Sequence, residues 1–249
     1  MTAGDVLSRS TDNVLANWEA LLLEIGVSLV ATLAFTLVAL AAVMPMALEP
    51  RRAPVTVIVV LTCTLLLVLL LRTGVTSFAT AATARIYIDG ARTAAAAPEV
   101  GRAAYRSFSF PAWKAAGKAM WARVFGVQVA VGAVIVIVVG LPFLLMMMLP
   151  KGVSGCVGCV VLPLILAAVL VISIWSRKAV VIAVDRGSGV EESLGAAWRD
   201  IAARLGEHLV PLLAIGVLTW VASCVLFVVA TAAGGCWSLA ALVALEKPR

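Results

Sequence analysis

The sequence predicts an all-α fold, a polytopic transmembrane helical bundle of five to six spans in a single domain over residues 1–249. Hydrophobic residues make up 63% of the chain and charged residues 13%, and the mean hydropathy is +1.11. A soluble domain is nearer half apolar and about a quarter charged, because it needs a polar shell. Long uncharged stretches also recur along the chain, and segments with amphipathic helical spacing precede them. Such a chain needs lipid as its solvent.

The uncharged stretches define the predicted spans, because a hydrocarbon core about 30 Å thick takes roughly twenty helical residues. The first four spans lie within 25–48, 53–71, 124–150 and 152–176. The last stretch, 208–245, is long for one span and short for two. We expect a complete span over 209–231, a break at Gly234 and Gly235, and a returning segment over 236–245 that crosses only part of the bilayer.

The distribution of basic residues predicts the orientation. Segment 72–123 holds eight of the nineteen Lys and Arg residues, and segment 177–207 holds five. One helical hairpin separates the two segments, so they lie on the same side, which the positive-inside rule identifies as the cytoplasm. The N-terminus is then cytoplasmic, and we expect a multi-pass protein of the cell membrane. The richness in Ala, Val and Arg hints at a bacterial source, whereas Arg51 and Arg52 on the opposite side are a small contrary signal.

Each predicted hairpin follows a segment whose apolar residues recur at helical spacing, marked by Trp18, Trp113 and Trp198. The opposite faces carry Asp12, Asn13 and Asn17, then Lys114 and Lys118, then Arg199, Asp200 and Arg204. Amphipathic helices of this kind lie in the headgroup region, where a Trp ring is stable. The sequence therefore predicts three repeats of an interfacial amphipathic helix plus a transmembrane hairpin, the third one shortened. The repeat units span about 5–90, 105–187 and 190–249.

An aspartate followed closely by glycine occurs after each of the first two hairpins. Asp89 precedes Gly90, and Asp185 precedes Gly187. We interpret both places as turns that cap a new helix, because a carboxylate accepts backbone N–H groups there and glycine adopts the strained dihedral angles. A catalytic or ion-binding pair of aspartates is the alternative interpretation.

The stretch AVDRGSGVEESLGAAWRDIAARLGEHLVPLL at 183–213 is similar to the membrane domain attached to some glycerophosphoryl diester phosphodiesterases. Related stand-alone bacterial families of unknown function share the pattern. The resemblance covers most of the chain and rests on hydropathy, on the turn and on the SLGAAW helix start at 193–198. It implies a multi-spanning helical membrane domain and carries over no functional residue. The phosphodiesterase activity belongs to a separate barrel domain, for which 249 mostly intramembrane residues leave no room.

The motif GCVGC at 155–159 places Cys156 and Cys159 three residues apart. A disulfide is one interpretation, if the loop faces an oxidising compartment. A metal site is a second, but it needs further ligands, and the single histidine, His208, is assigned to the other side of the membrane. Packing of small residues is the third interpretation.

Two ionisable residues and one amide border or enter the predicted spans. We interpret His208 as an interfacial histidine, because a proton relay requires a deeper position and a partner. Glu24 lies about one turn inside the first span and is interpreted as marking the membrane boundary. Gln128, in the third span, is expected to form a hydrogen bond between helices.

The function most compatible with these features is a non-catalytic membrane scaffold, anchor or accessory subunit. Its cytoplasmic interfacial helices would contact membrane lipids, or another membrane or cytoplasmic protein. The predicted lipid or partner contacts are Arg102, Arg106, Lys114 and Lys118. The sequence holds no recognisable catalytic, nucleotide or metal motif, so we expect no enzyme and no cofactor, and the net charge of +6 is attributed to membrane orientation rather than to nucleic acid.

Two other classes of function remain as alternatives. A transporter or permease subunit would need buried ionisable groups or broken helices near the middle of the membrane. A lipid-handling enzyme using the cytoplasmic arginines would need a nucleophile or an acid–base pair, which the sequence does not indicate.

Overall fold

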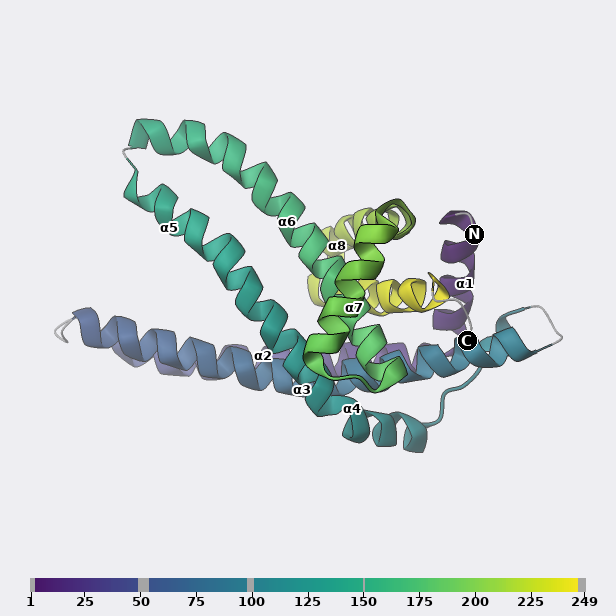
Figure 1. Cartoon of the computed structure of the whole chain (residues 1–249). Helices are drawn as coiled ribbons and strands as arrows, with labels where there is room; N and C mark the ends of the chain where they lie inside the picture. The colour runs from purple at the N-terminus through teal and green to yellow at the C-terminus, as the bar shows by residue number, and fades with distance from the viewer. Residues whose placement is uncertain (1–2, 49–53, 98–100, 150, 246–249) are drawn as a thin grey trace.

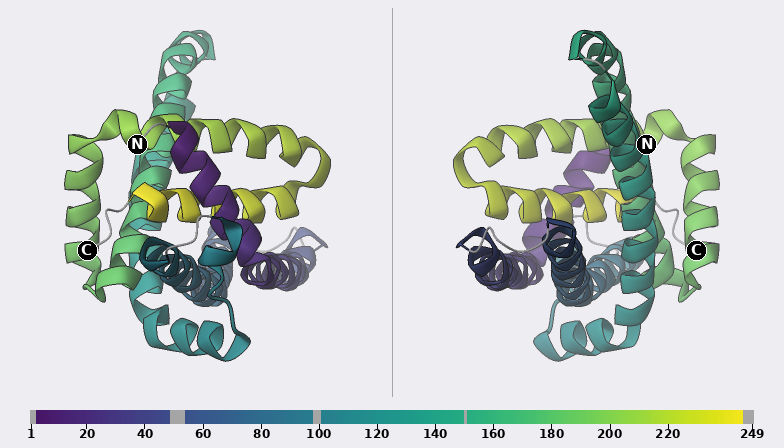
Figure 2. Two further views of the ribbon diagram at one scale, coloured as in Figure 1. Left: turned by 90° about the vertical axis from the view of Figure 1, so that its right-hand side faces the viewer. Right: turned by 90° about the vertical axis from the view of Figure 1, so that its left-hand side faces the viewer.

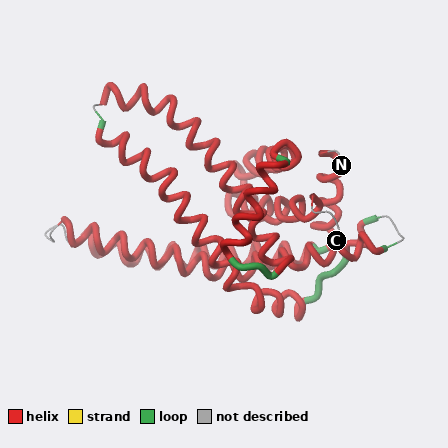
Figure 3. The backbone as a smooth tube through the Cα atoms, in the orientation of Figure 1, coloured by secondary structure: helices red, strands yellow, loops and turns green. Residues whose placement is uncertain are grey.

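The computed structural model describes residues 3–48, 54–97, 101–149 and 151–245, which form helices joined by short connections, with no strand among them (Figure 3). In chain order the elements are α1 (Ala3–Ala16), α2 (Trp18–Leu48), α3 (Pro54–Ala96), the 3-10 helix η1 (Arg102–Tyr105), α4 (Phe110–Ile135), the π-helical segment η2 (Val136–Gly140), α5 (Leu141–Met148), α6 (Lys151–Arg186), α7 (Val190–Ala203) and α8 (Leu205–Leu245). The all-α prediction is therefore confirmed for the described residues.

Two long hairpins give the molecule its shape. Helices α2 and α3 form the first, and α4, η2 and α5 pair with α6 in the second; their tips point away from the other helices and from each other (Figure 1). Four helical stretches in the described residues are long and apolar enough to cross a membrane, namely Trp18–Ala42, Val59–Ala96, Phe110–Met146 and Val160–Arg186. These stretches match the first four predicted spans, so the chain is a membrane protein with at least these hairpins available for lipid.

The inner ends of the hairpins join α1, η1, α7 and α8 in a compact unit that we call the body. Large apolar side chains are exposed along the outer parts of the hairpins, as at Leu37 and Leu164, whereas the inner ends are buried, as at Tyr87 and Val181. The buried core therefore lies in the body, and the outer hairpins carry the surface that lipid would cover.

Helix α3 is longer than a bilayer is thick. Its 43 residues extend about 64 Å at roughly 1.5 Å per residue, about twice a hydrocarbon core. Gly74 lies about 30 Å along the axis from Pro54, and its carbonyl accepts a hydrogen bond from the Trp121 indole Nε1 (2.7 Å). Because Trp concentrates at bilayer interfaces, we infer that the membrane boundary on the body side lies near this level.

Helix α8 doubles back on itself into two limbs (Figure 2). The helical assignment runs from Leu205 to Leu245, through Gly234 and Gly235 and through the reversal itself, so the break expected at the two glycines stays a prediction. The returning limb was expected, and it packs in the core of the body, where Leu242 is fully buried. Most side chains of the predicted fifth span, 209–231, lie outside the described ones, so that span stays a prediction.

The three segments predicted as amphipathic are helical. The first covers the end of α1 and the start of α2. The second begins α4, where the Ser109 hydroxyl accepts a hydrogen bond from the Ala112 N–H (3.3 Å), and the third is α7. The face that α4 buries differs from the prediction. Trp113 is buried against Phe78 (ring centroids 5.5 Å apart) rather than offered to headgroups, because the first turns of α4 pack on α3. The repeat relation and the position of these helices in the bilayer plane stay predictions.

The first predicted aspartate–glycine turn is wrong. Asp89 and Gly90 lie inside the continuous helix α3, where Asp89 Oδ2 forms an ion pair with Arg85 Nε one turn earlier (3.0 Å). The second place does end a helix, because Gly187 has a φ of 65°, which glycine adopts without strain. Its N-cap role is nevertheless wrong, since the residue that precedes α7 is Gly189 and not Asp185.

Candidate functional site

A buried polar network joins the first hairpin to α8. Glu24 of α2 is only 7% exposed, and its carboxylate accepts hydrogen bonds from the Thr80 hydroxyl of α3 (3.1 Å, Oε1) and from the Cys236 thiol of α8 (3.1 Å, Oε2). Thr83, one turn after Thr80, donates instead to the Ala20 carbonyl of α2 (3.5 Å). Glu24 is therefore buried beneath the return limb of α8, and its position at the membrane boundary stays a prediction.

Arg177 of α6 brings the second hairpin into the same network. Its guanidinium Nη1 donates to the carbonyls of Gly234 (3.2 Å) and Gly235 (3.0 Å) at the start of the return limb. The charges of Arg177 and Glu24 also attract each other. The network thus contains residues from all three hairpin units, and its opposite charges stabilise the burial of both groups.

The depth of this network can be estimated along the helices. Glu24 lies about 36 Å from Leu48 at the tip of the first hairpin, and Thr80 lies about 39 Å from Pro54. Arg177 lies about 39 Å from Lys151 at the tip of the second hairpin. All three values exceed a hydrocarbon core of about 30 Å. The polar groups therefore lie at the inner ends of the two hairpins, far from the hairpin tips.

A second charged cluster lies where α6, α7 and α8 meet. Asp200 Oδ2 forms an ion pair with Lys178 Nζ (3.0 Å) and lies 3.2 Å from His208 Nε2, and both neighbours are fully buried. Arg204 Nε also donates to Asp200 Oδ1 (3.1 Å). Burial alone would raise the pKa of Asp200, but the hydrogen bonds from Arg204 and Lys178 outweigh it and lower that pKa from 3.8 to about 2.

His208 differs from its prediction. It is buried and not interfacial, and its ring Nδ1 lies 2.9 Å from the Arg204 carbonyl while Nε2 faces Asp200. The reason is that α7 ends at Arg204, where the chain turns sharply, so the first turn of α8 folds against α7. Sequence alone could have paired His208 with Asp200 only by anticipating this turn.

Two asparagines assigned to a polar outer face lie in the interior. Asn13 Nδ2 donates to the Tyr87 carbonyl (2.9 Å), and Asn17 Nδ2 donates to the Tyr105 carbonyl (2.8 Å). Asn17 Oδ1 accepts the backbone N–H groups of Ser107 and Phe108 (2.9 Å each). The amides satisfy backbone groups of a connection that has no secondary-structure partner, so they hold it against the corner between α1 and α2.

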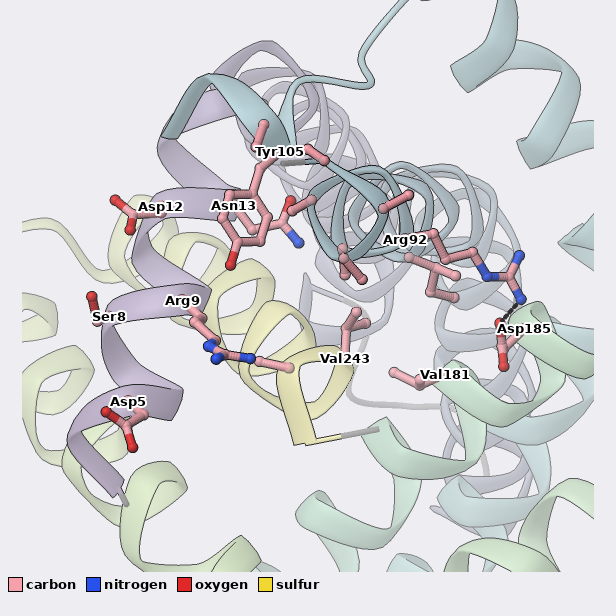
Figure 4. Close-up of a pocket in the computed structure, with 18 of the residues that line it drawn as sticks. Asp5, Ser8, Arg9, Asp12, Asn13, Arg92, Tyr105, Val181, Asp185 and Val243 are labelled. Carbon is pink, nitrogen blue, oxygen red and sulfur yellow. Dashed lines mark hydrogen bonds and ion pairs between the residues drawn. The ribbon is translucent and has the colours of Figure 1, made fainter. Parts of the chain in front are cut away.

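A cavity of about 850 Å³ lies in the body (Figure 4). Helix α1, η1 and the last turns of α3, α6 and α8 surround it. Charged side chains of both signs line it, namely Asp5, Arg9, Asp12, Arg92, Asp185 and Arg186. Arg92 Nη2 forms an ion pair with Asp185 Oδ1 (2.6 Å) across the ends of α3 and α6, and Asp89 approaches the same guanidinium at 3.9 Å. The two predicted aspartates are therefore brought together, through Arg92.

The four predicted lipid or partner contacts fall into two kinds. Arg106 is bound within the chain, because its guanidinium forms two contacts with Glu19 (2.5 and 2.6 Å) and donates to the Ala16 carbonyl (2.6 Å). Arg102 lies 3.8 Å from Asp12, near the cavity. Lys114 and Lys118 are exposed on α4 and lie within two turns of Trp121. These two lysines remain available to an external partner.

The remaining sequence predictions have mixed outcomes. Gln128 Oε1 accepts a hydrogen bond from the Ser77 hydroxyl (2.7 Å), which confirms the expected link between helices. Cys156 and Cys159 lie in α6, but their side chains are outside the described ones, so the disulfide, metal and packing interpretations stay open. Among the described residues, no group of three His, Cys, Asp or Glu side chains is placed to hold a metal ion.

Comparisons with known proteins find no relative of this chain. The chain matches no protein-family model, and neither the curated proteins nor the solved structures contain a significant match. The resemblance to the phosphodiesterase-associated membrane domain therefore stays a prediction from the sequence.

Proposed function

We propose that the chain is a non-catalytic membrane scaffold, anchor or accessory subunit, with its body on the cytoplasmic side of the cell membrane. The observation that supports this most is the network of Glu24, Arg177 and Cys236. One residue comes from each hairpin unit, and their contacts fix the hairpins relative to one another. Since these contacts join the inner ends of the hairpins to α8, we expect the charges to hold the body together at the membrane surface.

The exposed lysines of α4 are the proposed contacts for anionic lipid or for an acidic partner surface. Lys118 lies about one helical turn from Trp121, whose indole is at the inferred membrane boundary. A basic residue near an anionic leaflet contributes about 1 kcal/mol to association. Arg106 is committed to Glu19, and Arg102 lies at the far end of the body, so neither shares this role.

Native mass spectrometry of the full chain, released from nanodiscs that contain phosphatidylglycerol and phosphatidylcholine, tests the lipid contact. The variant Lys114→Gln/Lys118→Gln should retain fewer phosphatidylglycerol molecules, corresponding to about 1 kcal/mol per lysine. Arg102→Gln is the matched control and should retain as many as the wild type. Equal loss in both variants would contradict the assignment to α4.

A transporter or permease subunit is the second candidate, and the same network favours it. Glu24 and Arg177 are ionisable residues buried among helices that lead into the membrane, and such groups often mark ion pathways. Proton flux into liposomes that contain the purified chain separates the two proposals. Flux that disappears in Glu24→Gln while the protein still inserts would support transport, whereas no flux above empty liposomes supports the scaffold.

A further inference from the structure

The cavity of the body has the size and location of a small-molecule site. Its volume of about 850 Å³ lies within the range of roughly 300–1,000 Å³ found for ligand pockets. Five separate chain segments surround it, from α1 to the end of α8 (Figure 4). A cavity shared by so many elements is a preformed feature of the body.

Arginines dominate the unpaired charge in this cavity. Arg92 is paired with Asp185, and Asp12 faces Arg102. The side chains of Arg9 and Arg186 form no hydrogen bond or ion pair within the described ranges. Arg9 points from α1 into the cavity (Figure 4). An unpaired guanidinium is a strong hydrogen-bond donor for carboxylate and phosphate groups.

Tyr105 supplies a second donor opposite Arg9. Its side chain projects from η1 into the cavity (Figure 4), and its phenol lies close enough to Arg9 and Asp12 to feel both charges. Burial raises the pKa of Tyr105 above its ordinary value, so the hydroxyl stays protonated at neutral pH and can donate to an anion.

The distance from the membrane favours a soluble ligand over a lipid headgroup. Arg92 lies about 27 Å further along α3 than Gly74, which is at the inferred membrane boundary. A phospholipid headgroup layer is much thinner than this, since the headgroups add only about 5–8 Å to each side of the hydrocarbon core. The cavity therefore opens to the aqueous side.

We propose that this cavity binds a small soluble anion that carries a carboxylate or a phosphate group, held by Arg9 and the Tyr105 hydroxyl. Arg186 adds positive charge at the rim, and the Arg92–Asp185 ion pair fixes the ends of α3 and α6 that form the wall. The proposal goes beyond the scaffold function and does not depend on it.

Equilibrium dialysis with the full chain in phosphatidylcholine nanodiscs tests the proposal, with inorganic phosphate and citrate as separate probes. Saturable binding of at least one probe is expected. Arg9→Gln should weaken that binding about tenfold or more, because it removes a charged hydrogen bond. The control Arg199→Gln, an exposed arginine of α7 outside the cavity, should change it less than about twofold.

A second variant tests whether binding needs the open volume of the cavity as well as the charge of Arg9. Ala94 lines the cavity without a polar role, so Ala94→Trp should block binding by filling it and leave Arg9 in place. Thermal unfolding without ligand checks that each variant is folded. Absence of saturable binding in the wild type, or wild-type affinity in Arg9→Gln and Ala94→Trp, would overturn the proposal.

A comparison of two lipid compositions shows whether the bound anion is a soluble molecule or a lipid headgroup. Binding of the probe should be the same in phosphatidylcholine nanodiscs and in nanodiscs that contain phosphatidylglycerol. Competition by phosphatidylglycerol would overturn the assignment to a soluble ligand and assign the cavity to a lipid headgroup. Lys114→Gln/Lys118→Gln should bind the probe normally, so failure of the anion site and failure of the scaffold proposal give different results.

Discussion

The thiol of Cys236 lies 3.1 Å from a carboxylate oxygen of Glu24, although 212 residues separate them in the chain. This contact holds two parts of the body together, because it joins the return limb of α8 to the first hairpin. It also gives a glutamate in an apolar helix hydrogen-bond partners, since the thiol and the Thr80 hydroxyl both reach its carboxyl oxygens.

The Glu24–Arg177 attraction should be measurable as a coupling energy. Glu24→Gln leaves Arg177 buried with only carbonyl partners, so we expect a loss of about 1–3 kcal/mol in the free energy of unfolding. In a double-mutant cycle with Arg177→Met, the two losses should not add, and the interaction energy should exceed about 1 kcal/mol. Glu191→Gln, an exposed glutamate of α7, is the control and should change stability by less than about 0.5 kcal/mol. Additive losses would show that the two charges do not interact.

Gly90 should tolerate no side chain. A Cβ at this position would lie 2.6 Å from the Tyr105 carbonyl oxygen and 2.7 Å from Asn13 Oδ1. Gly90→Ala should therefore destabilise the protein by about 1–3 kcal/mol, as overpacking does. Gly195→Ala in α7 is the matched control, because nothing lies within 4 Å of its Cβ, and it should stabilise the helix by up to about 1 kcal/mol. Thermal unfolding in detergent compares the pair, and an equal effect of both substitutions would refute the close approach at Gly90.

Asp200 should make stability depend on pH in the acid range. Its pKa is lowered to about 2 in the folded protein from 3.8, so its contribution is fully present above pH 3.8. That contribution should be lost as the pH falls from about 4 to 2, because the carboxylate is protonated at a lower pH in the folded state than in the unfolded state. Asp200→Asn should lower the melting temperature at pH 7 and remove this part of the acid dependence. An unchanged acid profile in Asp200→Asn would contradict the ion pairs with Lys178 and Arg204.

The membrane topology can be tested with single cysteines in a cysteine-free background. Arg92→Cys and Glu191→Cys lie in the body and should be protected from an impermeant thiol reagent in intact cells. Gly155→Cys lies near the tip of the second hairpin and should be labelled from outside. Labelling of position 92 in intact cells would reverse the proposed orientation.

The sequence predicted the features that depend on local composition and periodicity. The uncharged stretches identified the four long apolar helices, and the amphipathic spacing identified the end of α1 with the start of α2, the start of α4, and α7. Gln128 was predicted to link two helices, and it does so through Ser77. These predictions succeeded because helix formation and lipid exposure follow from neighbouring residues along one segment.

The sequence could not show which polar residues are buried, because burial depends on contacts between distant segments. Glu24 and His208 are near the ends of apolar stretches, where a charged residue usually marks a boundary. The fold-back of α8 and the sharp turn at Arg204 cover them instead. The inward position of Asn13 and Asn17 was missed for the same reason. The partner of Asn13 lies in α3, 74 residues away, and Ser107, a partner of Asn17, lies in the connection after η1, 90 residues away.

By itself, then, the sequence determined that the chain is helical, that two hairpins are suited to lipid, and that basic residues gather at one end. Tertiary structure alone decided that this end is a packed body with paired charges and a cavity lined by charged side chains of both signs. The physical reason is that the hydropathy of a helix determines whether lipid or water surrounds it. The partners of Glu24, Asp200 and Arg92 depend instead on how the helices turn and cross.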